Sequence, residues 1–99
     1  MTAVFEKQLL ARGEDLLVLF SAPWCKPGHR LEARLASMAE PKGFDLITVN
    51  VDRSPALAER YRVTAIPSIT AFRKGQEVSR RLGELSSDDL EGWLTEIPR

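Results

Sequence analysis

The stretch Leu16–Phe20, with the sequence Leu-Leu-Val-Leu-Phe, is an unbroken apolar run between acidic residues and a Ser-Ala-Pro segment. A run of five residues is short for a buried helix, and it lacks the polar positions that a solvent-facing side would need. Such a run is typical of a strand that is buried on both faces, as in a parallel sheet. A sheet of this kind has to be covered by helices on both sides, so the run predicts an α/β fold.

The rest of the chain supplies the helices and strands that such a sheet requires. Apolar spacing and helix-start signals predict helices over about residues 2–12, 26–40, 55–61 and 86–96. Strands are predicted over residues 16–20, 44–51, 68–72 and 77–82, with Lys74-Gly75-Gln76 as the turn of a hairpin. Strands separated by helices imply parallel neighbours, and the hairpin adds an antiparallel edge. We therefore expect a single domain over residues 1–99, with a mixed sheet flanked by helices.

The charge balance and the cysteine count exclude several classes of protein. Lys plus Arg equals Asp plus Glu, at 14 each, so no net charge favours nucleic acid or an acidic membrane surface. The single cysteine, Cys25, cannot form a disulfide within these 99 residues, which fits a reducing compartment. We find no signal-peptide pattern, and the longest apolar run is too short to cross a bilayer. These features predict a cytoplasmic protein that binds neither nucleic acid nor membrane.

Cys25 is the residue on which the chemistry is expected to depend. It opens the predicted helix 26–40, where unpaired N–H groups and the helix dipole favour negative charge. The cationic neighbours Lys26, His29 and Arg30 also favour a thiolate, so we expect a reactive nucleophile with its sulfur at the protein surface. The alternative is a small, buried hydrophobic residue. No metal site is expected, because Cys25 and His29 cannot fill a four-ligand site.

Two segments carry a resemblance to a known family. Residues 24–28, Trp-Cys-Lys-Pro-Gly, resemble the active-site pattern Trp-Cys-Gly-Pro-Cys of the thioredoxin family. Residues 63–68, Val-Thr-Ala-Ile-Pro-Ser, resemble the family's loop in which a cis proline faces the active cysteine. Further segments match in the family's order, from about residue 4 to residue 96: Val49–Asp52, Phe72–Gly75 and Leu82–Ser86. The resemblance implies a thioredoxin fold and thiol–disulfide exchange through Cys25.

The resemblance also implies a groove beside Cys25 that binds disulfide-containing or extended protein segments. In the family, a cis bond before the proline that matches Pro67 exposes the backbone of the preceding residue, here Ile66, to pair with the peptide as an added strand. The alternatives are an ordinary trans turn proline at Pro67 and a plain core residue at Trp24. The residues that would line the groove are Trp24, Pro27, Ile66, Pro67 and Gly83.

The chain departs from the family where the second thiol would act. Gly28 stands in place of the second cysteine, and Lys26 replaces a glycine. Leu19 and Thr48 stand where family members carry a buried Asp and a Lys that handle the proton of that second thiol. A buried carboxylate is costly without a task or a partner, so these changes agree with one another. We expect Cys25 to attack a disulfide and an external thiol to resolve the product.

The N-terminus also departs from the family. Three residues precede Val4, the first of the apolar residues at helical spacing in the first predicted helix, too few for the strand with which thioredoxins usually begin. The sheet is then expected to have four strands, with strand 44–51 at an edge. An uncovered apolar edge is a pairing hazard or an interface, so this strand, or Cys25 itself, offers a contact for a dimer.

Three functions fit these observations. The first is single-thiol exchange through Cys25, with no bound cofactor and with glutathione as a candidate co-substrate, for which Gly28 would leave room unless it reflects drift. The second is a non-catalytic thioredoxin-fold module that binds peptides or proteins. The third is a redox sensor that dimerises through Cys25. Because one fold hosts unrelated activities, the fold alone does not choose between them.

Overall fold

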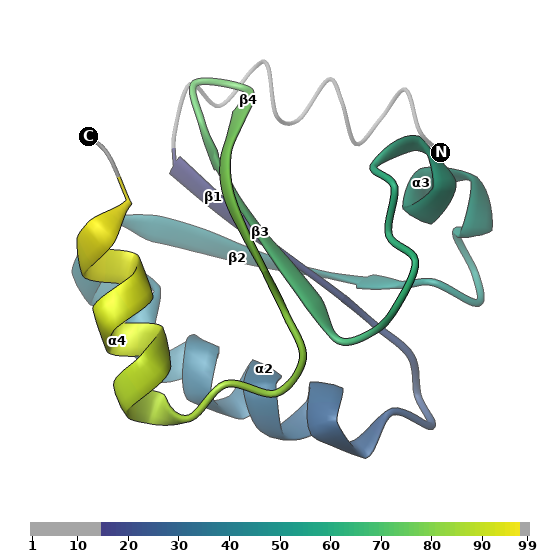
Figure 1. Cartoon of the computed structure of the whole chain (residues 1–99), viewed down its shortest axis with the longest axis horizontal. Helices are drawn as coiled ribbons and strands as arrows, with labels where there is room; N and C mark the ends of the chain where they lie inside the picture. Colours follow the sequence, from purple (N-terminus) through teal and green to yellow (C-terminus); the bar gives the residue numbers. More distant parts are fainter. Residues whose placement is uncertain (1–14, 98–99) are drawn as a thin grey trace.

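The computed structural model describes residues 15–97 of the chain. The predicted helix over residues 2–12 and the expected lack of an N-terminal strand lie outside these residues. No helix in the described part is long and apolar enough to cross a bilayer. In chain order, and with the labels of Figure 1, the elements are β1 (Asp15–Ser21), α2 (Lys26–Met38), the 3-10 helix η1 (Glu40–Lys42), β2 (Phe44–Asn50), α3 (Pro55–Arg60), β3 (Ser68–Arg73), β4 (Gln76–Leu82) and α4 (Ser87–Glu96).

The four strands of the described part form one mixed sheet in the order β2-β1-β3-β4. β1 and β2 are parallel and are connected through α2, whereas β3 is antiparallel to both β1 and β4. The register pairs Leu19 with Thr48 on β2, and Phe20 with Ser68 on β3. Within residues 15–97, β2 therefore lies at one edge of the sheet. The predicted four-stranded mixed sheet with a hairpin is confirmed.

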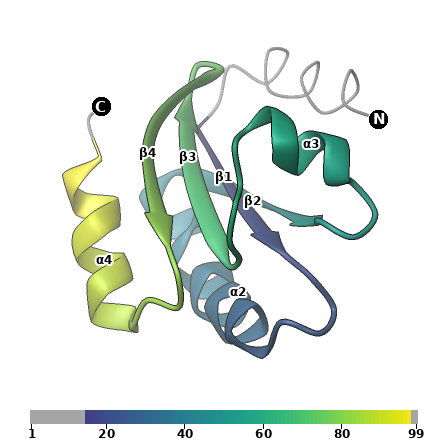
Figure 2. The same ribbon diagram turned by 45° about the vertical axis from the view of Figure 1, so that its right-hand side comes forward.

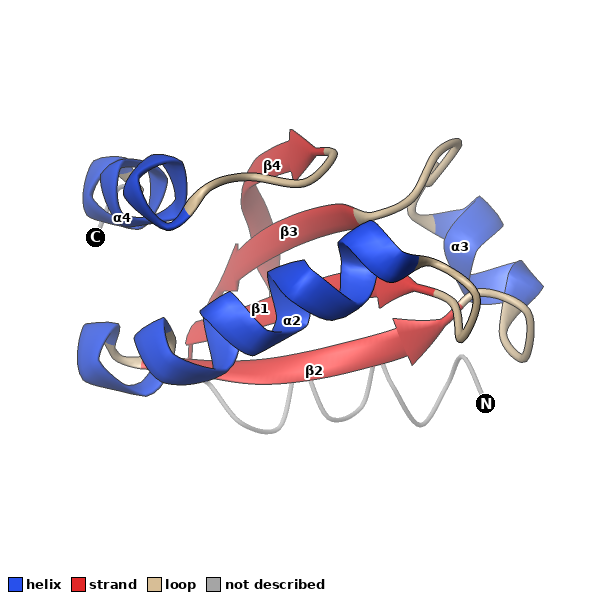
Figure 3. Ribbon diagram, turned by 90° about the horizontal axis from the view of Figure 1, so that it is seen from below, coloured by secondary structure: helices blue, strands red, loops and turns tan. Residues whose placement is uncertain are grey.

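β1 is buried on both faces, as its apolar run predicts. Leu17 and Leu19 pack with side chains of α2 and α4 on one face. Val18 and Phe20 pack on the opposite face, in a cluster that includes Leu57 of α3. Because successive strand residues point to opposite faces, a strand between two helical layers buries apolar side chains on both faces. Figure 3 shows α2 lying across one face of the sheet, and Figure 1 shows α3 on the other.

The end of the second helix differs slightly from the prediction. α2 ends at Met38 rather than near Glu40, and the next residues form η1 instead. The physical reason is Pro41, which has no N–H to donate and crowds the preceding helical turn. Gly43 then reverses the chain with a φ of 82°, a conformation that glycine adopts without a steric penalty.

The two later helices begin where polar residues predict, although only one is capped by a side chain. The Ser86 Oγ accepts a hydrogen bond of 3.1 Å from the Asp89 N–H at the start of α4. Asp88 and Asp89 lie in the first turn of that helix, where the dipole favours negative charge. Ser54 is the N-cap residue of α3, but its side chain makes no capping hydrogen bond.

Candidate active site

Cys25 lies between the end of β1 and the first turn of α2. Its N–H donates to the Ala22 carbonyl at 3.0 Å, which closes a tight turn, and its own carbonyl accepts from the His29 N–H at 3.1 Å. Cys25 is the N-cap residue of α2, yet its side chain makes no capping hydrogen bond. Pro27, at the second helical position, has no N–H, and no acidic residue lies in the first turn. The thiol therefore stands at a helix N-terminus whose dipole favours an anion.

The expectation that the sulfur lies at the protein surface is wrong. Cys25 is buried, with 4% of its surface exposed. A Cβ atom built on Gly28 would lie 3.2 Å from Cys25 Sγ, so the sulfur packs where Gly28 has no side chain. A thiolate at this position has little contact with water and depends on groups of the protein.

Trp24 lies on the surface beside the end of β2. Its side chain is 66% exposed, and its Nε1–H donates to Asp52 Oδ2 at 2.9 Å. Asp52 is itself held by a hydrogen bond from its N–H to Asn50 Oδ1 at 2.9 Å. The interpretation of Trp24 as a plain core residue is therefore wrong. Sequence analysis assigned no contact to Asp52, although an acidic residue after a strand parallel to β1 comes to the same edge of the sheet as residue 24.

His29 and Lys26 were predicted to stabilise the thiolate, and their placements differ. His29 Nε2–H donates to the Pro23 carbonyl at 2.7 Å, so the ring holds the turn before Cys25. Lys26 is exposed at the first position of α2. Arg30 is the cation with an electrostatic effect on the site: its pKa is raised mainly by the hydrogen bond to Glu84, and a negative Cys25 sulfur contributes in the same direction.

The loop between α3 and β3, which contains Pro67, comes to the same end of the sheet as the turn between β1 and α2 (Figure 2). Because Phe20 of β1 pairs with Ser68 of β3, Pro67 lies beside the end of β1. The Ile66–Pro67 peptide bond is cis. Pro67 is buried, and its carbonyl accepts a hydrogen bond of 2.8 Å from the Gly83 N–H. Pro67 and Gly83 are thus brought together, on the side of β1 opposite to β2.

The other residues predicted to line the groove lie at the same end of the sheet but are not connected by a hydrogen bond like that between Gly83 and Pro67. Ile66 is half-buried and packs against the cluster on the α3 face of the sheet. Pro27 is half-buried in the first turn of α2. Trp24 is bonded to Asp52 after β2, whereas Gly83 follows β4, so the predicted residues are spread along one end of the sheet. Leu82, the last residue of β4, is an exposed apolar side chain that sequence analysis did not single out.

Glu84 ties the segment after Gly83 to α2, a contact that the sequence did not reveal. Its carboxylate accepts two hydrogen bonds from Arg30, at 2.8 and 2.9 Å, and one from Arg34 at 2.9 Å. These cations lower the pKa of Glu84 to about 2, with the Arg30 hydrogen bond as the largest cause. Arg30 and Arg34 are four residues apart on one helical face, the only sequence signal for such a clamp.

Leu19 and Thr48, which replace the charged pair of the family, are neighbours in the sheet. They are register partners on β1 and β2. Leu19 is fully buried, and the Thr48 Oγ1–H donates to Glu32 Oε2 at 2.7 Å. The apolar side chain of Leu19 therefore fills the buried position of the family's Asp, and the neutral Thr48 takes the position of the family's Lys.

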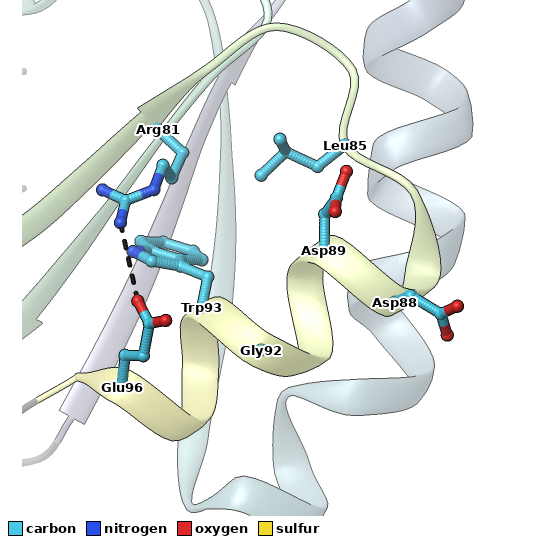
Figure 4. A pocket seen from close by; sticks show the side chains of 7 residues that line it. All are labelled: Arg81, Leu85, Asp88, Asp89, Gly92, Trp93 and Glu96. Carbon is cyan, nitrogen blue, oxygen red and sulfur yellow. Dashed lines mark ion pairs between the residues drawn. The ribbon is translucent and has the colours of Figure 1, made fainter.

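The described surface has a cavity next to the candidate site and another over α4. One, of about 240 Å³, adjoins the turn before Cys25 and is lined by Ser21, Ala22, Pro23, His29, Glu32, Thr48 and Asn50. The other, of about 370 Å³, lies over α4 and includes none of the predicted site residues. Figure 4 shows its lining: Arg81, Leu85, Asp88, Asp89, Gly92, Trp93 and Glu96.

Comparisons with known sequences agree with the fold and with the residue patterns. The family model Thioredoxin matches residues 1–96. Thioredoxin H2 of Arabidopsis thaliana is 35% identical over 83 residues, which cover 83% of this chain and 62% of the plant protein. A thioredoxin of Chlamydia caviae is 40% identical over 76 residues, which cover 76% of this chain and 74% of the bacterial protein. The chain thus spans less than two thirds of the plant relative and about three quarters of the bacterial one.

Solved structures share the architecture along nearly the whole chain. Mitochondrial thioredoxin 3 from Saccharomyces cerevisiae, in its oxidized form, superposes with a TM-score of 0.83 at 23% identity, over 96% of this chain and 89% of the yeast chain. A mutant thioredoxin from Halobacterium salinarum NRC-1 gives a TM-score of 0.84 at 26% identity, over 94% and 82% of the two chains. The chain therefore belongs to the thioredoxin family, as a thioredoxin-like redox protein with one cysteine in its 99 residues.

Proposed function

We propose that this protein carries out single-thiol disulfide exchange through Cys25. The observation that carries the proposal is the lack of a partner thiol: the 99 residues hold one cysteine, and glycine stands at position 28, where the family has its second cysteine. The thiolate is the attacking form of cysteine. Cys25 stands at the N-terminus of α2, where the helix dipole favours an anion.

The proposed cycle has two exchange steps. The Cys25 thiolate attacks one sulfur of a disulfide R–S–S–R′, forms the mixed disulfide Cys25–S–S–R and releases R′–S⁻. An external thiolate then attacks the R sulfur, forms a new disulfide with R and returns Cys25 as a thiolate. When R and the external thiol are both glutathione, the products are oxidised glutathione and the R′ thiol, which takes up the proton of the external thiol.

The substrate is proposed to bind across the carboxyl end of β1. Exposed apolar side chains flank this end: Trp24 lies beside the end of β2, and Leu82 ends β4. Between them, the hydrogen bond from Gly83 to Pro67 holds the loop that contains Ile66. An extended peptide would pair with the Ile66 backbone as an added strand, which gives affinity without demanding one sequence.

A peptide-binding module without chemistry is the second candidate. The observation that favours it is the contrast in exposure at the site. Cys25 is 4% exposed, whereas the Trp24 side chain is 66% exposed and Leu82 61%. A module of this kind would bind extended peptides equally well when Cys25 is replaced by Ser, whereas single-thiol exchange would be abolished.

The partners and the location follow from the proposed cycle. The resolving thiol has to reach the R sulfur, which is bonded to the nearly buried Cys25 sulfur, so we infer a small thiol, glutathione, as co-substrate, and no bound cofactor. Glutathione-dependent exchange requires a reducing compartment, and we infer the cytoplasm. A dimer through the β2 edge or through Cys25 stays a prediction.

The test uses two assays on the whole chain. In insulin reduction coupled to thioredoxin reductase, the protein should show no turnover, because it cannot resolve a mixed disulfide internally. Incubation with oxidised glutathione should add one glutathione to each protein molecule, as seen by intact-protein mass spectrometry. Cys25→Ser, the matched control, should add none. Sustained insulin turnover without another thiol would overturn the proposal, and so would failure of the wild-type protein to take up glutathione.

A further inference from the structure

Ser21, the last residue of β1, carries a buried hydroxyl with no hydrogen-bond partner in the described part of the chain. The residue is 5% exposed, and its Oγ is shielded from solvent. A hydroxyl that is buried without a partner is unfavourable, because it has lost its hydrogen bonds to water. Such a group in a native structure calls for an explanation.

The position of the hydroxyl supplies one. A Cβ atom built on Gly28 would overlap Ser21 Oγ and would lie 3.2 Å from Cys25 Sγ. The hydroxyl and the sulfur therefore adjoin the same point on the first turn of α2. Gly28 has no side chain to fill that point, and Ser21 Oγ lies there instead. A serine hydroxyl also turns freely about its Cβ–Oγ bond to aim its proton at an acceptor.

Cys25 needs such a donor because its surroundings offer few. At 4% exposure, a thiolate has little access to water. Pro27 removes one of the N–H groups that the first turn of α2 would otherwise present. The His29 Nε2–H is engaged with Pro23, and the Arg30 guanidinium is engaged with Glu84.

We propose that the Ser21 hydroxyl donates a hydrogen bond to the Cys25 thiolate, and that Gly28 is the residue that makes room for it. This inference rests on the proposed function. The hydroxyl stabilises the sulfur in the state in which it attacks. It also stabilises the sulfur as a leaving group when an external thiol resolves the mixed disulfide, because a better stabilised thiolate leaves faster. No bond to Ser21 forms or breaks.

Other groups near the site carry charge and have to be considered in any measurement against pH. On α2 these are Lys26, His29, Arg30 and Glu32, of which Arg30 is paired with Glu84 and Glu32 accepts from Thr48. After β2, Asp52 accepts from Trp24. Substitution of Ser21 leaves all of these groups in place, so a change in the pH profile of Cys25 reports on the hydroxyl itself.

The experiment measures the rate of iodoacetamide alkylation of Cys25 against pH in the intact protein. Ser21→Ala removes one oxygen atom and should move the profile to higher pH by about one pH unit, the shift expected from losing one hydrogen bond to a charged group. Gly28→Ala, whose Cβ would displace the hydroxyl, should move it in the same direction. The double variant should move it no further than Ser21→Ala does.

Thr70→Val is the matched control. Thr70 lies on β3, and its hydroxyl is the other buried hydroxyl in the described part that has no hydrogen-bond partner. In the register of the sheet, Thr70 pairs with Val18, which is three residues before Ser21. Its removal should leave the profile unchanged. Coincident profiles for Ser21→Ala and the wild-type protein would overturn the inference, and so would an equal shift for Thr70→Val. Circular dichroism verifies folding, and Ser21→Ala decides the question if Gly28→Ala does not fold.

Failure of this inference can be distinguished from failure of the proposed function. Alkylation measures the thiolate whether or not the protein exchanges disulfides. A shift in Ser21→Ala without uptake of glutathione by the wild-type protein would support the hydrogen bond and contradict single-thiol exchange. Glutathione uptake by the wild-type protein, without a shift of the alkylation profile in Ser21→Ala, would support single-thiol exchange and contradict the hydrogen bond.

Discussion

Adding a single methyl group at Gly28 should destabilise the protein, and removing the Ser21 hydroxyl as well should cancel most of the loss. The new Cβ would overlap Ser21 Oγ and would lie 3.0 Å from Ser21 Cβ. Overpacking of this kind costs about 1–3 kcal/mol. Alanine in place of a helical glycine gains about 0.5–1 kcal/mol. Gly28→Ala should therefore lower the free energy of unfolding by about 1 kcal/mol.

The coupling free energy between positions 21 and 28 tests their proximity more directly than the loss in Gly28→Ala alone. In a Ser21→Ala background the overlapped oxygen is gone, and the tight contacts with Ser21 Cβ at 3.0 Å and Cys25 Sγ at 3.2 Å remain, which the helix preference of alanine offsets. Gly28→Ala should then be nearly neutral, so the two substitutions should couple by about 1 kcal/mol. Urea unfolding of the wild-type protein, the two single variants and the double variant, monitored by circular dichroism, gives these free energies. The dependence of the free energy on urea concentration should be the same in all of them. Additivity to within about 0.5 kcal/mol would refute the proximity of Ser21 and Gly28.

Further substitutions test other parts of the structure. Because the pKa of Glu84 is about 2, its pairing with Arg30 stabilises the fold above the usual value of 4.5 and is lost as pH falls toward 2. The free energy of unfolding of the wild-type protein, measured with denaturant, should fall more over that pH interval than the free energy of unfolding of Glu84→Gln. An equal fall in the two proteins would contradict the stabilising role of the Glu84–Arg30 pair. Ser86→Ala should cost about 1 kcal/mol of unfolding free energy, with Ser86→Asp neutral, because the cap to Asp89 is lost only in the first. Leu19→Asp should cost more than about 3 kcal/mol, because Thr48 cannot neutralise a buried carboxylate, whereas Leu19→Met should cost under about 1.5 kcal/mol. A well-folded Leu19→Asp protein of wild-type stability would show that this position is not part of the core.

The fold could be predicted from the sequence because its signals are local and agree with one another. The apolar run of β1 requires a helical layer on each face, and the turn at Lys74–Gln76 joins β3 to β4. Errors arose at helix ends, where a single backbone conformation decides the boundary. Pro41 lies inside η1, and the chain reverses only at Gly43.

The position of Cys25 was predictable, but its surroundings were not. A cysteine after a buried strand and before a helix stands at the helix N-terminus whatever the tertiary contacts are. Its burial and the bond from His29 to Pro23 depend on side-chain directions within one turn. The contacts of Trp24 with Asp52 and of Arg30 with Glu84 join residues far apart in the sequence, which no local pattern reveals.

The overlap of a Gly28 side chain with Ser21 is a similar case. Sequence reasoning treats Gly28 as the missing second thiol, with either drift or room for a ligand as its cause. The structure gives the position a steric reason, because Ser21 Oγ occupies the place of a Cβ atom. Since the two positions belong to different elements, only the packing of α2 against the end of β1 relates them.

The account depends most on single-thiol turnover through Cys25. The direct measurement is the reduction of a peptide–glutathione mixed disulfide by glutathione, coupled to glutathione reductase and followed by NADPH absorbance. The wild-type protein should accelerate the reaction above the uncatalysed rate, with a rate that rises with glutathione concentration, and Cys25→Ser should not. A wild-type rate equal to that of Cys25→Ser, under conditions in which both proteins bind the peptide, would contradict the account and favour the peptide-binding module.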